Sequence, residues 1–550
     1  MELTDAQKAI VEQDGNCVVL AAPGSGKTFV ISEKIKRILR GNLLREYQGV
    51  IAISYTRKAA KNLKDRVFNN IPFSRTSFFG TIDGFCFSEI VSPFLPHIWS
   101  KASTELDVKS LADYDNEFQE ENKWIKDKKG LSALTDTEWN FLKGLYDDED
   151  YVLVETLELL ACFVLEKSKA CLSYLKARYK YIFIDEYQDA DLYTSILFDK
   201  LIQLGLVAIA VGDVKQSIFG YDKKDCKYLQ ALVDRPDFHH FELDKNFRCS
   251  PSIVNYSSRL MESKSELLPA KQCDVHLVRI KGTEASIGEF LSGYIKDCCK
   301  LYHVEKMNNV AILARNNKFL KVIANNLSLP YCLFDTTGLD KDSNLRSALY
   351  AGILRFYFDS DTTFLDVVED YADFESFTRY EKKKLLQLKN QLVEMKIEVD
   401  KDTILGCCKN MADIILPKVP EGSSFEILEK VLSDEKLLES YKPIRDVQVN
   451  LMTLHKSKGL EFDLVFHLNL HEWVFPSKHP VNGDFKHPKY ASWQQDLDLH
   501  YVGITRAKKA CYFIVPAQRT NSNDKVLVAR DSEFLYHNNV QVLRDLVDFR

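Results

Sequence analysis

A glycine-rich loop between a short apolar strand and a helix constrains this 550-residue chain more than any other feature. Residues 17–20 (Cys-Val-Val-Leu) predict a buried strand, and residues 28–39 have the apolar spacing of a helix. The loop between them, residues 21–28, reads Ala-Ala-Pro-Gly-Ser-Gly-Lys-Thr. The backbone amides of such a loop point inward and hold phosphate at a helix N-terminus. The pattern therefore predicts a parallel α/β fold with a phosphate site at the end of its first strand.

The same alternation of short apolar strands and helices continues along the chain and predicts two doubly wound parallel sheets. We expect strands of the first sheet at residues 17–20, 50–54, 181–184 and 207–211. We expect strands of the second sheet at residues 275–280, 310–314, 447–453, 464–468 and 510–515. Residues 91–174 show no apolar strand run, and residues 341–444 are helical and charged in pattern, so both segments are predicted to be helical insertions.

The composition is that of an ordinary soluble globular protein. It is 45% apolar and 28% charged, and no charged-then-apolar leader or long apolar run is present, which predicts a cytoplasmic protein without contact to a membrane. The net charge of −6 excludes a wholly basic coat protein but leaves room for a local basic groove. The 13 cysteines include no CxxC pair, so we expect reduced core residues rather than a metal site.

Four side chains define the predicted hydrolytic centre. Lys27 would reach the β- and γ-phosphates of ATP, while the Thr28 hydroxyl and the Asp185 carboxylate would hold Mg²⁺. Glu186, next to Asp185 at the end of the strand at 181–184, would be the general base for the attacking water. The loop residues expected to line the ATP phosphates are Ala22, Pro23, Gly24, Ser25 and Gly26.

Residues 185–189 (Asp-Glu-Tyr-Gln-Asp) resemble the second motif of superfamily 1 helicases of the UvrD/Rep/PcrA kind. Further stretches resemble the other motifs of that family in the same order: residues 3–7, 54–60, 212–219, 246–248, 453–462 and 501–508. The resemblance implies two RecA-like motor lobes, each with a short helical insertion. The implied boundaries are 1–90 and 175–270 for the first lobe, 91–174 for its insertion, 271–340 and 445–550 for the second lobe, and 341–444 for its insertion.

The resemblance also implies roles around ATP. Gln7 would read the adenine edge, because a carboxamide offers both a donor and an acceptor, and Phe247 would stack on the base. Gln216 and Arg248 would contact the γ-phosphate. Arg506 would act from the second lobe as an arginine finger, which stabilises charge on the transferred phosphoryl group. Glu461 completes the predicted ATP-binding residues.

A third set of residues is predicted by the resemblance to contact single-stranded or tailed duplex DNA: Tyr55, Thr56, Arg57, Phe219, Tyr221, Thr453 and His455. Two positions depart from the family pattern. Asp222 stands where the family usually has Arg, and Asp83 stands where it usually has His. Both changes place negative charge near the expected DNA path, which predicts intact ATP hydrolysis with a weaker grip on DNA.

Residues 79–85, 88–90, 93–94 and 246–249 are similar to the helicase-like subunit of Gabija anti-phage systems. That likeness implies an OLD-type nuclease partner with a TOPRIM domain, in a hetero-oligomer. The expected function is DNA-stimulated ATP hydrolysis with 3′-to-5′ translocation or unwinding. The alternatives are an ATP-hydrolysing DNA sensor with little motor output and a kinase or GTPase-like switch, which would need neither a second sheet nor two arginines. A stand-alone nuclease is disfavoured, since 147–150 (Asp-Asp-Glu-Asp) is better explained as a solvated turn.

Overall fold

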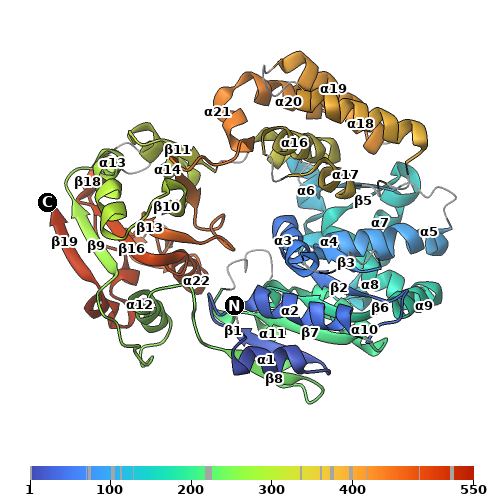
Figure 1. The fold of residues 1–550 in the computed structure, drawn as a ribbon, viewed down its shortest axis with the longest axis horizontal. Helices are drawn as coiled ribbons and strands as arrows, with labels where there is room; N and C mark the ends of the chain where they lie inside the picture. The colour runs from blue at the N-terminus through green and yellow to red at the C-terminus, as the bar shows by residue number, and fades with distance from the viewer. Residues whose placement is uncertain are drawn as a thin grey trace.

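The protein is represented by a computed structural model that describes residues 3–41, 43–69, 71, 76–100, 106–111, 114–127, 129–216, 226–334, 337–342, 344–359, 362–371, 374, 377–394, 400–417, 419–481, 484–520 and 525–549. At residues 57, 58, 485 and 486 it describes the backbone alone. Two parallel sheets, each covered by helices, form two lobes that lie side by side (Figure 1). The predicted α/β fold with two RecA-like lobes is confirmed.

The first lobe is built on a six-stranded sheet in the order β3-β2-β6-β7-β1-β8, in which all neighbours are parallel. Its strands are β1 (Cys17–Ala21), β2 (Gly49–Ile53), β3 (Phe78–Gly80), β6 (Tyr179–Ile184), β7 (Val207–Gly212) and β8 (His239–Leu243). Successive strand side chains point to opposite faces. One face packs on α1 (Asp5–Glu12), α2 (Lys27–Arg40) and α3 (Arg57–Phe68), and the other on helices that include α8 (Leu157–Lys167) and α10 (Leu192–Gln203).

The second lobe is built on a seven-stranded, all-parallel sheet in the order β11-β12-β10-β13-β16-β9-β19. Its strands are β9 (Val275–Ile280), β10 (Val310–Ala314), β11 (Tyr331–Leu333), β12 (Val449–Thr453), β13 (Phe462–His467), β16 (Ala507–Pro516) and β19 (Asp545–Phe549). One face packs on α13 (Glu284–Leu301) and α14 (Asn317–Asn325), and the other on α12 (Pro251–Met261) and α22 (Trp493–Ile504).

Two helical segments interrupt the sheets, as the sequence predicts. The first lies between β3 and β6 and contains α4 (Ile82–Phe85), α5 (Ser92–Trp99), α6 (Asn116–Glu121), α7 (Asp136–Glu149), α8 and α9 (Lys169–Arg178). The second lies between β11 and β12 and contains α15 (Gly338–Lys341), α16 (Leu345–Phe358), α17 (Phe364–Glu369), α18 (Arg379–Glu394), α19 (Lys401–Ile415), α20 (Ser424–Ser433) and α21 (Glu435–Leu438). The second segment packs around a hydrophobic core of its own. The residue boundaries of the four predicted parts stay a prediction.

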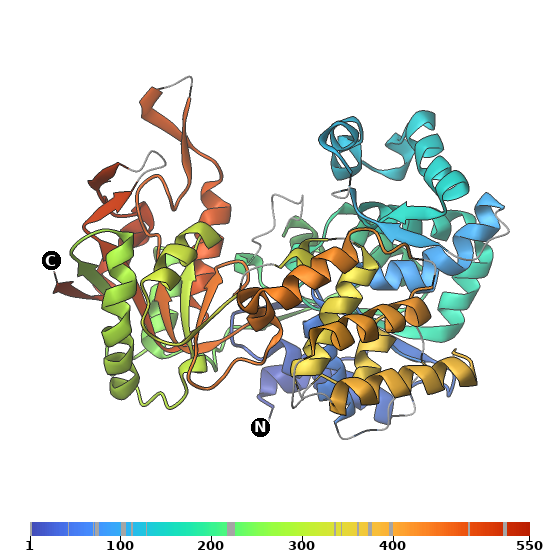
Figure 2. The same cartoon turned by 90° about the horizontal axis from the view of Figure 1, so that it is seen from above.

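The bounds of the expected strands lie no more than three residues from the observed ones, but several short strands do not follow the sequence pattern. The first helical segment holds a parallel pair, β4 (Asp107–Lys109) with β5 (Tyr151–Leu153), where no strand was expected. Two hairpins, β14 (Lys478–Val481) with β15 (Asp484–Tyr490) and β17 (Gln518–Thr520) with β18 (Val526–Val528), stand out from the second lobe (Figure 2). Within the described ranges no helix is both long and apolar enough to cross a membrane.

The second helical segment reaches back to the first lobe. In Figure 1, α17 lies above α3, and two ion pairs join the helices. Lys61 Nζ lies 2.8 Å from an Asp366 carboxylate oxygen, and Lys64 Nζ lies 3.7 Å from one of Glu369. All four side chains are about one-third exposed. The second helical segment therefore contacts the first lobe here, in addition to the contacts between the lobes around the site described next.

Candidate active site

The loop after β1 has the backbone shape that a phosphate cradle requires. Gly24 and Gly26 have φ of 68° and 85°, a left-handed conformation that favours glycine. A Cβ added to Gly24 would lie 2.5 Å from the Cβ of Arg248. The amide of Phe247 donates to the Gly24 carbonyl at 2.9 Å, so residues 246–248 cover the loop directly. The conformation of the loop and the position of the segment after β8 therefore depend on each other.

This packing gives a first prediction. Gly24→Ala should remove most ATP binding, because the new methyl group meets both an unfavourable φ and the Arg248 side chain. Binding of a fluorescent ATP analogue measures the effect, with thermal unfolding as a check on folding. Gly406→Ala is the matched control, since a Cβ there meets nothing within 4 Å. Unchanged affinity in Gly24→Ala would contradict the assigned role of the loop.

Lys27, Asp185 and Glu186 meet at the carboxyl ends of β1 and β6. Lys27 Nζ lies 3.4 Å from Glu186 Oε1. Burial alone would lower the pKa of Lys27, but the carboxylates of Glu186, Asp213 and Asp185 outweigh it and raise the pKa. Burial and the Glu186 charge raise the pKa of Asp185. Burial would raise the pKa of Glu186 too, yet the ammonium groups of Lys27 and Lys458 lower it. Of the two neighbouring carboxylates, Glu186 therefore stays ionised to the lower pH.

The polar groups around the loop fit a nucleotide phosphate with a divalent cation. The Thr28 hydroxyl donates to Asp185 Oδ2 at 3.3 Å, which places two oxygen ligands of the kind that Mg²⁺ prefers beside each other. The Ser25 hydroxyl is 1% exposed and has no hydrogen-bond partner among the described residues. A buried polar group without a partner is costly, so an outside ligand such as a phosphate oxygen would satisfy it.

The backbone of Glu186 is strained. Its φ of 59° places a residue other than glycine in the left-handed region. The Glu186 amide donates to Asp185 Oδ1 at 3.0 Å, and the side-chain amide of Gln188 donates to Glu186 Oε2. The carboxylate thus has one oxygen facing Lys27 and the other held by Gln188.

Arg506 enters this site from the second lobe, at the end of α22 and directly before β16. It is 2% exposed. Its guanidinium donates to the carbonyls of Val502 and Leu460 at 3.0 and 3.2 Å and reaches Gln216 Oε1 in the first lobe at 3.4 Å. Burial, helped by the charge of Arg248, lowers the pKa of Arg506 to about 10. The arginine is therefore held in place by its own lobe while it points across the interface.

Other charged pairs cross the same interface. Arg248 Nε donates to Glu461 at 2.8 Å, and Lys508 Nζ lies 2.6 Å from the other oxygen of that carboxylate. Arg248 and Glu461, which the sequence predicts to bind ATP, are thus paired with each other in this structure. Their roles in ATP binding stay predictions. Lys458 Nζ lies 2.6 Å from Asp189 and donates to the Gln216 carbonyl at 3.0 Å. The two lobes are thus joined at the candidate ATP site by a partly exposed pair, Arg248 with Glu461, and a desolvated pair, Lys458 with Asp189.

The two residues predicted to recognise adenine differ in their surroundings. Phe247 is 47% exposed, and Lys245 Nζ lies 5.1 Å from its ring centre, so a flat face is open to a base. Gln7 is 4% exposed. Its Oε1 accepts from the Thr4 amide at 3.1 Å and its Nε2 donates to the Ser25 carbonyl at 3.0 Å. Gln7 therefore supports the phosphate loop directly, and its contact with adenine stays a prediction.

The residues predicted to bind DNA lie at the ends of β2 and β12. Tyr55 is partly exposed, Thr56 caps α3 by accepting from the Ala59 amide, and Thr453 ends β12. Burial, with the nearby charges of Arg315 and Lys458, lowers the pKa of His455 to about 4, so this imidazole is neutral near pH 7. The side chain of Arg57 and residues Phe219, Tyr221 and Asp222 fall outside what the structure describes, and their roles stay predictions.

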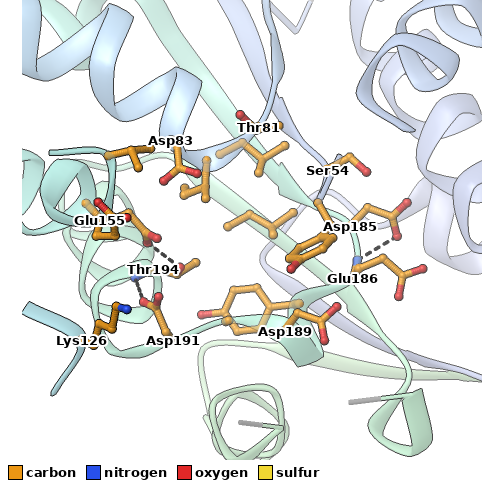
Figure 3. Close-up of a pocket in the computed structure, with 18 of the residues that line it drawn as sticks. Ser54, Thr81, Asp83, Lys126, Glu155, Asp185, Glu186, Asp189, Asp191 and Thr194 are labelled. Carbon is orange, nitrogen blue, oxygen red and sulfur yellow. Dashed lines mark hydrogen bonds between the residues drawn. The ribbon is translucent and has the colours of Figure 1, made fainter. Parts of the chain in front are cut away.

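A cavity of about 490 Å³ lies beside Asp185 and Glu186, on the side of the first helical segment (Figure 3). Its walls come from the end of β2, from residues 81–83, from residues 125–126 and 154–158, and from residues 184–194. Besides those two, the carboxylates that line it are Asp83, Glu155, Glu158, Asp189 and Asp191. This lining is negative, and a DNA phosphate would be repelled from it.

Four residues of the candidate site have contacts that the sequence does not predict. Gln188, Asp213, Lys458 and Asn246 lie inside the recognised motifs, but no role was given to them. Asn246 Oδ1 accepts from the amides of Arg248 and Cys249, both at 2.8 Å, and so shapes the segment that covers the loop. Their position within the motifs was the available signal; their burial and partners depend on the tertiary fold.

The fold and this arrangement define a two-lobed ATP-dependent motor. The chain matches the UvrD/REP helicase N-terminal domain over residues 3–94 and 96–236 and the UvrD-like helicase C-terminal domain over residues 362–518. These matches cover more than half of the 550 residues. The chain belongs to the UvrD-like helicase family, whose members are ATP-dependent helicases, and the prediction of this family is confirmed.

Three relatives show the range of the resemblance. The Gabija protein GajB of Bacillus cereus (strain VD045) is 26% identical over 92% of this chain and 93% of its own length. The ATP-dependent DNA helicase Rep of Buchnera aphidicola subsp. Acyrthosiphon pisum is 23% identical over 98% of both chains. The ATP-dependent DNA helicase PcrA of Bacillus subtilis (strain 168) is 22% identical over 94% of this chain and 82% of its own.

Proposed function

We propose that this protein is a DNA-stimulated ATPase that moves 3′ to 5′ along single-stranded DNA and acts with a nuclease in anti-phage defence. The observation that carries the proposal is the meeting of Lys27 and Glu186 from the first lobe with Arg506 from the second around one phosphate cradle. A site completed by two lobes makes hydrolysis depend on their relative position. That dependence is what turns an ATPase into a motor.

The hydrolytic step follows from the charges. Glu186 is held ionised by Lys27 and Lys458, so it accepts a proton from the water that attacks the γ-phosphorus. Lys27 and Arg506 offset the negative charge that builds on the phosphoryl oxygens. Thr28 and Asp185 would hold Mg²⁺, which supplies Lewis-acid stabilisation of the same oxygens when bound. Phe247 offers its exposed ring to the adenine.

DNA would lie across the ends of β2 and β12, where Tyr55, Thr56, Thr453 and His455 come from the two lobes. An exposed tyrosine ring is a stacking platform for a base, worth roughly 1–3 kcal/mol. The 3′-to-5′ polarity is carried over from the family. We propose DNA rather than RNA as the bound nucleic acid because two relatives are named as DNA helicases.

A DNA sensor with little motor output is the second candidate. Asp83 favours it, because this residue adds a carboxylate to the already negative cavity beside Tyr55. Such a lining weakens phosphate contacts near the expected DNA path. A sensor would hydrolyse ATP in response to DNA without moving along it.

One pair of assays separates the two. We expect ATP hydrolysis to rise with added oligo(dT), and a streptavidin block to be displaced from the 5′ end of a biotinylated strand but not from the 3′ end. Lys27→Ala is the control and should abolish both signals. Stimulated hydrolysis without displacement from either end would favour the sensor, and hydrolysis indifferent to DNA would contradict both candidates.

The nuclease partner is proposed from the likeness to the Gabija protein GajB, which spans nearly the whole of both chains. We expect an OLD-type nuclease with a TOPRIM domain, produced together with this chain, to co-elute with it in size-exclusion chromatography. Separate elution at micromolar concentration would contradict the proposed hetero-oligomer. The Lys27→Ala variant should co-elute as the parent does, since the partner is not expected at the ATP site.

A further inference from the structure

Gln188 lies between the candidate general base and the loop that follows β7. Its Nε2 donates to Glu186 Oε2, and its Oε1 accepts from the Asp213 amide at 3.0 Å. It is 0% exposed. A carboxamide is uncharged and offers a donor to a carboxylate and an acceptor to an amide in one rigid plane.

The backbone of β7 approaches this carboxamide closely. A Cβ added to Gly212 would lie 2.6 Å from Gln188 Oε1 and 3.1 Å from the Gln188 amide nitrogen. Glycine at the end of β7 therefore permits the contact. The end of β7 therefore helps to fix the position of the Gln188 carboxamide.

From Asp213 the hydrogen bonds continue through Gln216 to the second lobe. Asp213 Oδ2 accepts from Gln216 Nε2 at 2.9 Å, and Gln216 Oε1 accepts from Arg506 Nη2 at 3.4 Å. Gln216 and Asp213 are 3% and 5% exposed. A buried run of hydrogen bonds thus leads from Arg506 through Gln216, Asp213 and Gln188 to Glu186.

Resting on the ATPase proposed above, we infer that Gln188 is a positioning residue that holds the Glu186 carboxylate in place for catalysis and ties it to the loop that Arg506 contacts. Because the backbone of Glu186 is in the left-handed region, we expect its side chain to need a hydrogen-bond partner that keeps it in place. Glu186 is then in position to accept a proton once Arg506 of the second lobe contacts the loop after β7.

The test compares Gln188→Glu and Gln188→Met in the full chain with oligo(dT) present. The Glu variant keeps the shape and the acceptor for Asp213 but puts a second carboxylate against Glu186; the Met variant removes both hydrogen bonds. We expect kcat to fall about 10- to 100-fold in each, as for residues that orient a reactive group. Affinity for a fluorescent non-hydrolysable ATP analogue should stay within about twofold, which also shows that the site is folded.

The split between kcat and KM separates positioning from simple support of the fold. A misplaced base slows the chemical step, so kcat should fall while the KM for ATP changes little. Gln203→Glu, at an exposed position at the end of α10, should leave both constants unchanged.

A double-mutant comparison tests the link to the loop. If Gln188 and Gln216 act through the same hydrogen bonds, the effects of their substitutions on kcat should not be independent. The fold-loss of kcat in the double variant Gln188→Met/Gln216→Met should then be clearly smaller than the product of the fold-losses in the two single variants. Full multiplicativity would overturn the link, and parental kcat in both Gln188 variants would overturn the positioning role. Lost analogue binding with reduced thermal stability in both variants would assign Gln188 to the fold alone. A parent chain that hydrolyses no ATP would instead refute the proposed function.

Discussion

Glu186→Gln should bind ATP as the parent does and hydrolyse it about 10³-fold more slowly. The amide keeps the size of the side chain but accepts no proton from the attacking water. Lys27 and Lys458 hold the pKa of Glu186 below its ordinary value, so the parent base is ionised throughout the neutral range. Single-turnover hydrolysis with oligo(dT), beside equilibrium binding of a fluorescent ATP analogue, measures the two quantities separately.

The pH dependence of stability adds a second readout for the same change. Because the folded-state pKa of Glu186 is depressed, its ionised form stabilises the fold above the unfolded-state pKa, and this contribution is lost as pH falls through the folded-state value. Glu186→Gln should therefore lose stability mainly at neutral pH. Glu46→Gln, at an exposed position, is the matched control. Parental hydrolysis by Glu186→Gln would refute the role of Glu186 as the base.

The second large effect concerns Arg506. Arg506→Ala should lower kcat about 10³-fold or more while the KM for ATP changes little, since a finger acts on charge that builds in the transition state. Arg506→Lys keeps a positive charge but not the planar fork of donors, so its kcat should stay well below that of the parent. Steady-state ATP hydrolysis with saturating oligo(dT) gives both constants.

The surroundings of Arg506 add a stability effect to this prediction. Its guanidinium donates to the Val502 and Leu460 carbonyls, and truncation removes both of these charge-assisted hydrogen bonds, at a cost of about 1–3 kcal/mol. Thermal unfolding should therefore accompany the kinetics. Arg530→Ala, at a side chain that is 80% exposed, is the control for loss of an arginine. An unchanged kcat with a raised KM would assign Arg506 to ground-state binding instead.

The interior of both sheets was predictable from sequence, whereas their edges were not. The strand at 310–314 was placed at its observed bounds, because a strand buried on both faces is a continuous apolar run. β8 reads His-His-Phe-Glu-Leu and lies at the edge of the first sheet, where one side meets solvent and the apolar pattern fades. β19, at the edge of the second sheet, was missed for the same reason.

The site divides in a similar way. Lys27, Thr28, Asp185 and Glu186 follow from a strand, a glycine-rich loop and paired carboxylates, and the structure brings them within contact of one another. The proposed role of Gln188 depends on its two hydrogen-bond partners, Glu186 and Asp213, which follow different strands, β6 and β7. The pairing of Arg248 with Glu461 joins residues 213 positions apart, a distance that no local pattern reports.

The contact between α3 and α17 has a mechanical consequence. Its two ion pairs are partly solvated, so each is worth about 0–1 kcal/mol and weakens with salt. The Lys458–Asp189 pair at the ATP end is nearly dry, with side chains 9% and 2% exposed, and salt screens it far less. The contact at the candidate ATP site is therefore less sensitive to salt than the contact between α17 and α3. We expect rising salt to loosen the lobes first where α17 meets α3.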